Sequence, residues 1–180
     1  MRILRAFTVL TFLLAPPVLL ADALDSLHDL FKEYGREASV ANSFKADGKS
    51  WQLLKFWSVD CGICRAQVPV VSDMHSDAEQ TTGDQKDGDS DYRLRVTGIS
   101  VDALSREGEV LRYKQRYPSS YPNIQLPLIV INAWFESVAL EPFRGTPTYL
   151  LFDPQGNLAA MQTSILKQDS LRNFIARYKQ

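Results

Sequence analysis

Two cysteines are the residues in this chain best suited to chemistry. Cys61 and Cys64 are the only cysteines among the 180 residues, and Gly62 and Ile63 separate them. A structural disulfide stabilises most when it closes a long loop, which this spacing does not do. Two neighbouring thiols instead form a two-electron couple that exchanges with other disulfides. The spacing therefore predicts a redox site, tuned by the two residues that surround the sulfurs.

The segments around the pair predict how it works. An apolar run over 51–57 is typical of a buried strand, and a helical pattern over 61–74 begins at Cys61. A sulfur at the start of a helix is favoured as a thiolate by the helix dipole and the first-turn N–H groups. We therefore expect Cys61 to be the nucleophile and Cys64, one turn later, to resolve the mixed disulfide.

Metal binding is the main alternative use of a Cys-x-x-Cys pair. Structural zinc needs four ligands, and the only histidines are His28 and His75, which we expect on solvated faces. Cu(I), a soft ion that suits thiolates, remains an alternative for the pair alone. We expect no resident metal or cofactor.

The N-terminal segment has the pattern of a secretory signal. Arg2 and Arg5 supply positive charge, an apolar run covers 6–20, and the small-x-small sequence of 21–23 is typical of a cleavage site. The pattern predicts a signal peptide over 1–23 and export to an oxidising compartment such as the periplasm. An uncleaved segment that anchors the protein is the alternative.

Composition indicates an ordinary globular domain over 24–180. The chain is 45% hydrophobic and 23% charged, with a formal net charge of −1. This charge gives no reason to propose nucleic acid or an anionic membrane as a partner. A cleaved product would have no stable membrane insertion.

The remaining patterns alternate between strands and helices. Further strands are expected at 94–101, 126–131, 149–153 and 158–162, and further helices at 24–34, 105–117 and 168–178. Residues 132–140 are ambiguous and fit a short helix. Residues 76–91 are polar and acidic, and we expect a solvated loop because their spacing does not match a calcium loop. Such alternation predicts a mostly parallel sheet with helices on both faces and an antiparallel end.

A second motif leads to a known family. The segment from Gly145 through Thr146, Pro147 and Thr148 ends in a strand, where a proline fits the first position. With the cysteine segment it resembles the thioredoxin superfamily, and within it the exported TlpA-like group. The matching residues are Phe56, Trp57, Cys61, Cys64, Arg65 and Pro69 in the first segment and Gly145, Pro147, Thr148, Asp153 and Gly156 in the second.

The resemblance implies an α/β, thioredoxin-like fold with a central mixed β-sheet flanked by helices on both faces. It implies a cis Pro147 against the cysteines and a Thr146 that pairs its backbone with an extended target. It implies exchange with the thiols or disulfides of exported proteins, and a membrane electron donor or acceptor. A reductant role, as in cytochrome c maturation, is favoured by the resemblance alone.

Three residues depart from the family pattern. Asp60 stands where tryptophan is usual before the first cysteine, and its carboxylate should raise the pKa of Cys61. Lys55 stands where thioredoxins carry a buried acid, and Gln67 where TlpA-like reductants often carry glutamate. The usual acids for moving a proton to or from Cys64 are therefore replaced.

Other functions remain open at this point. A disulfide-forming oxidase, a Cu(I) metallochaperone, a peroxidase and a structural module fit the sequence less well. The aromatic residues of 118–143 are expected to pack over the sheet, with a partner-binding surface as the alternative.

Overall fold

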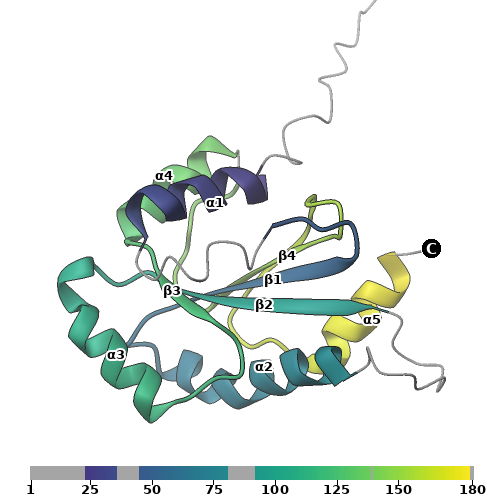
Figure 1. Ribbon diagram of the computed structural model, residues 1–180, viewed down its shortest axis with the longest axis horizontal. Helices are drawn as coiled ribbons and strands as arrows, with labels where there is room; N and C mark the ends of the chain where they lie inside the picture. The colour runs from purple at the N-terminus through teal and green to yellow at the C-terminus, as the bar shows by residue number, and fades with distance from the viewer. Residues whose placement is uncertain (1–22, 36–44, 81–91, 139, 179–180) are drawn as a thin grey trace, which may run out of the picture.

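The computed structural model describes residues 23–35, 45–80, 92–138 and 140–178. They fold around a five-stranded sheet of order β3-β2-β1-β4-β5 (Figure 1). The strands are β1 (Ser50–Trp57), β2 (Arg93–Ser100), β3 (Asn123–Gln125), β4 (Thr148–Phe152) and β5 (Leu158–Thr163). The signal expected over 1–23 lies, except for Ala23, outside the described residues, as does the acidic stretch 81–91.

The central strand β1 positions the cysteine pair. All eight of its residues are buried, which explains why it is rich in aromatic and aliphatic residues, because a strand covered on both faces has no solvent-facing side. It pairs parallel with β2 and antiparallel with β4, and Phe56 lies opposite Thr148. The end of β1 and the start of β4 therefore meet at one end of the sheet.

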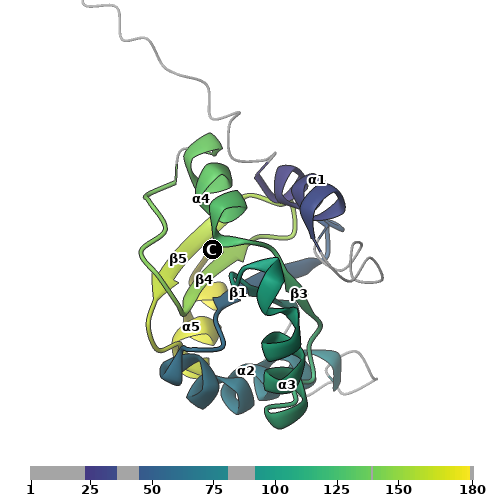
Figure 2. The ribbon, with the colours of Figure 1, turned by 90° about the vertical axis from the view of Figure 1, so that its left-hand side faces the viewer.

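Helices cover both faces of the sheet, as expected (Figures 1 and 2). On one face α1 (Ala23–Tyr34) and α4 (Leu128–Ser137) pack on Leu54 and Phe56. On the other, α2 (Gly62–Gln80) and α5 (Gln168–Tyr178) pack on Leu53. A short 3-10 helix (Leu104–Arg106) leads into α3 (Glu107–Arg116), which packs near the C-terminal end of β1. None of these helices is both long and apolar enough to cross a membrane.

Two predictions about secondary structure are wrong. The strand expected at 126–131 is instead the loop after β3 followed by the first turn of α4. Pro127 immediately precedes this helix, a position that proline tolerates well because the first helical N–H groups have no partner inside the helix. Residues 76–80, expected in a loop, belong to α2, which continues to Gln80.

The histidines do not lie on solvated faces. His28 is buried on the same face of α1 as Leu24, Leu27 and Phe31, at the i, i+3, i+4, i+7 spacing of a packed stripe. His75 is buried against the ring of Tyr121. Both histidines belong to the interior, which overturns the prediction.

The aromatic residues of 118–143 pack into the fold, as the favoured interpretation predicted. Trp134 and Phe135 are buried against Phe56, and the Trp134 indole donates a 2.9 Å hydrogen bond to the Ser26 hydroxyl. This bond ties α4 to α1. The aromatic cluster therefore forms core over the sheet.

The hairpin of β4 and β5 explains part of the second motif. The Asp153 carboxylate accepts hydrogen bonds from the backbone N–H groups of Gln155 and Asn157, at 3.0 and 2.9 Å. Gly156 has a φ of 89°, a conformation that favours glycine. The aspartate and glycine are thus the residues that shape the turn.

Candidate redox site

Cys61 and Cys64 form a disulfide where β1 leads into α2. Cys61 immediately precedes the helix, which begins at Gly62, and the Cα atoms of the two cysteines are 5.2 Å apart. The backbone N–H of Cys64 donates a 3.0 Å hydrogen bond to Cys61 Sγ. This N–H and the helix dipole both favour negative charge on Cys61 once the bond is reduced.

The two sulfurs differ in their access to solvent. Cys61 is half-buried, whereas the side chain of Cys64 has no exposed surface. Gly62 and Ile63 between them are both exposed, and Ile63 presents 46% of its surface. A target can therefore approach Cys61 and the backbone beside it, while Cys64 is shielded.

Aromatic side chains enclose Cys64 from the α3 side. Cys64 packs with Trp57, Val110 and Tyr113, and the rings of Trp57 and Tyr113 stack with their centroids 4.5 Å apart. Burial raises the pKa of Tyr113 to about 12. At neutral pH this tyrosine is therefore an uncharged neighbour of the buried sulfur.

Pro147 lies at the same end of the sheet as the cysteines. It immediately precedes β4, whose first residue pairs with the end of β1, and the Thr146–Pro147 peptide bond is cis. Pro147 is buried and Thr146 half-buried. The Pro147 carbonyl accepts a 2.9 Å hydrogen bond from the Ser164 N–H, which holds the segment to the end of β5.

Gln67 is a buried structural link. Its Oε1 accepts hydrogen bonds from the Tyr149 hydroxyl at 3.2 Å and from the Leu166 N–H at 2.8 Å. It therefore joins α2 to β4 and to the segment after β5. An amide does not titrate near neutral pH, so Gln67 does not replace the proton carrier that glutamate provides.

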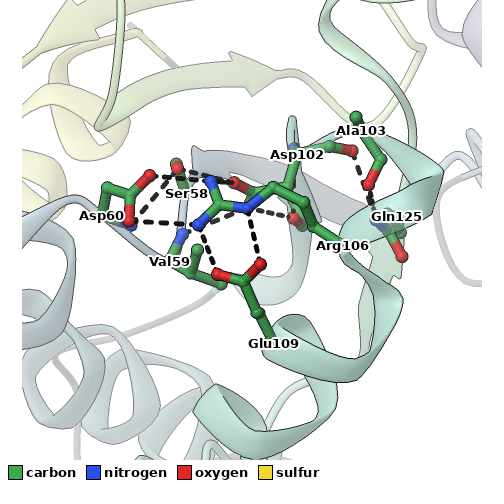
Figure 3. A network of polar contacts seen from close by, with 9 residues as sticks. Ser58, Val59, Asp60, Asp102, Ala103, Arg106, Glu109 and Gln125 are labelled. Atoms are coloured by element: carbon green, nitrogen blue, oxygen red, sulfur yellow. Dashed lines mark hydrogen bonds and ion pairs between the residues drawn. The ribbon is translucent and has the colours of Figure 1, made fainter.

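The negative charge of Asp60 is compensated by Arg106, a residue that the sequence patterns do not indicate. The Arg106 guanidinium donates two hydrogen bonds to the Asp60 carboxylate, at 2.7 and 3.2 Å, and also pairs with Glu109 (Figure 3). The hydrogen bond from Arg106 lowers the pKa of Asp60. Asp60 is thus a fully ionised but paired neighbour of Cys61, with 74% of its side chain exposed.

Asp102 anchors the loop that precedes Cys61. This buried carboxylate accepts hydrogen bonds from the Ser58 hydroxyl at 2.9 Å, the Val59 N–H at 3.1 Å and the Ser100 hydroxyl at 2.8 Å, as well as from Arg106 at 3.1 Å (Figure 3). Ser58 and Asp102 are 44 positions apart in the sequence. No spacing in the sequence signals this contact.

Lys55 lies beneath the buried cysteine. It is 1% exposed, and its ammonium donates hydrogen bonds to the Cys64 carbonyl at 3.3 Å and the Tyr121 hydroxyl at 3.0 Å. Burial lowers the pKa of Lys55 to about 8. Within the described ranges no group of three or more His, Cys, Asp or Glu side chains is placed to hold a metal ion.

Comparison with known proteins finds structural relatives only. No protein-family model and no curated protein matches the chain. Among solved structures, the thioredoxin domain of a Bacteroides vulgatus thiol-disulfide oxidoreductase is 22% identical, with a TM-score of 0.53 over 73% of this chain and 81% of that one. A thiol:disulfide interchange protein from Bacteroides sp. is 21% identical, with a TM-score of 0.53 over 73% and 74%.

A third solved structure is similar to this chain in fold. A secreted Mycobacterium tuberculosis disulfide oxidoreductase homologous to E. coli DsbE is 20% identical, with a TM-score of 0.51 over 73% of this chain and 84% of that one. At this level of identity the likeness concerns the fold. The chain has the mixed sheet and two helical layers of a thioredoxin-like α/β protein, as the resemblance predicted.

Proposed function

We propose that this chain is an exported thiol–disulfide oxidoreductase of the TlpA-like type, which exchanges disulfides with exported proteins and works as a reductant. The observation that carries the proposal is the asymmetry of the cysteine pair. Cys61 is accessible and its sulfur accepts a backbone N–H, whereas Cys64 is buried one turn away. This is the arrangement that disulfide exchange requires.

The exchange proceeds in two steps. The Cys61 thiolate attacks one sulfur of a target disulfide, which forms a mixed disulfide and releases the other target sulfur as a thiolate. The Cys64 thiolate then attacks Cys61 Sγ, which forms the Cys61–Cys64 disulfide and releases the second target thiolate. The target gains two electrons and the pair loses two, so an upstream dithiol must reduce the pair again.

The residues around the pair suit these steps. Thr146, half-buried at the end of the sheet beside β1, would offer its backbone to an extended target segment. Pro147 would hold that backbone in position, and the exposed Ile63 would contact the target. The periplasm is the proposed compartment, supported by the N-terminal pattern and by the likeness to a secreted oxidoreductase. A membrane protein is the proposed upstream donor.

A redox titration tests the proposal. The domain from Leu24 onward, equilibrated in glutathione and dithiothreitol buffers, should show one reversible two-electron couple. A potential near or below about −230 mV supports the reductant role, whereas one near about −120 mV would make the protein an oxidase that installs disulfides. Absence of a reversible couple would refute the redox function, and Cu(I) binding by the two thiolates would then be tested.

A further inference from the structure

Lys55 is a charged group in the centre of the sheet. It lies on β1, opposite Tyr149 of β4 and Gly98 of β2, and 1% of its surface is exposed. Its side chain points to the face covered by α2, where it reaches the Cys64 carbonyl and the Tyr121 hydroxyl. A lysine is almost never buried so completely without a charged partner.

Lys55 has no ion pair with any carboxylate in the part of the chain that the structure describes. Its two hydrogen-bond acceptors are both uncharged, and burial alone accounts for its lowered pKa of about 8. Most of the lysine is therefore still an ammonium at neutral pH. The charged and titratable groups that contact Lys55, border its cavity or lie opposite it on the sheet are Cys64 on α2, Tyr113 and Lys114 on α3, Tyr117 after α3, Tyr121 before β3 and Tyr149 on β4. His75 of α2 packs on Tyr121, and Arg65 of α2 acts on Tyr113.

The tyrosines near Lys55 do not supply a negative charge at neutral pH. Burial raises the pKa of Tyr113 to about 12 and raises that of Tyr121 still further. Cys64 is the remaining group that becomes an anion during the exchange. In the disulfide it is neutral, and in the mixed disulfide it must lose a proton before it attacks.

We propose that Lys55 is the buried cation that stabilises the thiolate of Cys64 and so speeds the resolution of the mixed disulfide. The inference deepens the proposed function and rests on it. A buried thiolate is costly without a nearby positive charge, and the ammonium bonded to the carbonyl of the same residue supplies that charge. Lys55 thus acts on the reaction through Cys64 and does not touch the target.

The resolving step begins with loss of the Cys64 thiol proton to water, and the electron pair left on Cys64 forms the new bond to Cys61. Lys55, Tyr113 and Tyr121 border a cavity of about 10 Å³, close to the smallest volume that holds a water molecule. The target sulfur leaves with the electrons of the bond that breaks. The charge of Lys55 is the same before and after the step.

The experiment compares Lys55→Met with Lys114→Met. Lys114 borders the same cavity from α3, so this control also removes a positive charge there. In a Cys61→Ser background, the ultraviolet absorbance of the Cys64 thiolate is followed against pH. Lys55→Met should raise the pKa of Cys64, with about tenfold less thiolate at a given pH below the midpoint, and Lys114→Met should change it less than about threefold.

A second readout uses the complete cysteine pair. With Cys61 and Cys64 both present, Lys55→Met should slow insulin reduction at neutral pH about tenfold, because resolution is slower. Thermal unfolding of each variant checks that the fold is retained. A Cys64 pKa that Lys55→Met leaves unchanged or lowers, or that Lys114→Met raises as much, would overturn the inference. If the unmodified chain has no reversible couple, the proposed function fails instead, so the two failures are distinct.

Discussion

The two sulfurs of the pair have opposite electrostatic surroundings. Cys61 follows Asp60, an exposed carboxylate in a network with Arg106, Asp102 and Glu109 that holds three acids and one cation. Cys64 lies above a single buried cation, Lys55. The first environment is negative, ion-paired and, at Asp60, open to solvent, whereas the second is positive, buried and without an ion pair among the described residues.

This difference predicts which charges have the larger effect on the reactivity of each cysteine. Around Cys61, water and salt screen the charges, and Arg106 compensates Asp60. Around Cys64, the lysine is 1% exposed, so bulk solvent screens it weakly, and burial is strong enough to lower its pKa to about 8. We therefore expect Lys55 to affect the reactivity of Cys64 more than the several charges around Cys61 affect that of Cys61.

The largest expected effect separates the roles of the two sulfurs. Cys64→Ser should abolish turnover in insulin reduction and accumulate a mixed disulfide on Cys61, because nothing resolves it. Cys61→Ser should also abolish turnover but form no mixed disulfide. Iodoacetamide should alkylate the remaining Cys64 at least about tenfold more slowly than Cys61 in the other variant, since Cys64 has no exposed surface. Equal alkylation rates would remove the asymmetry on which the comparison rests.

The next effect concerns the loop that carries Cys61. Asp102→Ala leaves the Ser58 hydroxyl, the Val59 N–H and the Ser100 hydroxyl without their acceptor, and should lower the free energy of unfolding by about 3 kcal/mol. Urea unfolding measures this loss. Asp102→Asn keeps the size and one oxygen acceptor, so it should lose less. An equal loss in both variants would mean that charge, and not hydrogen bonding, anchors the loop.

A smaller effect comes from the burial of Lys55. In the unfolded chain its pKa is about 10.5, and in the disulfide form it is about 8. Between these values the unfolded state binds more protons than the folded state, so stability rises with pH. The gain from pH 7 to pH 9.5 should be about 2 kcal/mol.

Urea unfolding of the oxidised protein at several pH values measures this gain, and Lys55→Met should remove it. The range stops below pH 10 because the buried tyrosines act in the opposite direction there. Their pKa values are raised in the fold, so ionisation of the unfolded state lowers stability. A pH dependence that persists in Lys55→Met would show that another group causes it.

Much of the fold could be predicted because local patterns agree with it. The run over 51–57 is mostly apolar because β1 is covered on both faces, and the final helix has the bounds expected from its periodicity. The error at 126–131 arises because a short apolar run fits a buried strand or a buried helix equally well. Ile129 is 79% exposed and Ile131 is buried, so the run has a helical face that its composition conceals.

The residues of the site also divide into those that the sequence could predict and those that it could not. Cys61, Cys64 and Pro147 could be proposed because they lie in short contiguous motifs. Asp102 meets Ser58 from 44 positions away, and Tyr121 meets Lys55 from 66 positions away. These contacts depend on how β2 and β3 pair with β1, which no local pattern specifies. From the sequence, Lys55 could be recognised only as a departure from the family pattern. The structure adds that it is buried and that it donates a hydrogen bond to the Cys64 carbonyl.

The smallest expected effect tests the exposed side of the comparison. In a Cys64→Ser background, Asp60→Asn should lower the pKa of Cys61 because it removes a neighbouring negative charge. Arg106→Gln should raise it because Asp60 then lacks its cation. The pH dependence of Cys61 alkylation measures both.

Salt distinguishes this network from the lysine. Asp60 is exposed and Arg106 partly exposed, so both shifts should shrink at 1 M salt, where the screening length is about 3 Å. The effect of Lys55→Met on Cys64 should persist under the same conditions because both groups are buried. If the shifts at Cys61 survive high salt, the Asp60–Arg106 pair acts at short range on the sulfur, and the contrast between a screened and a buried environment does not hold.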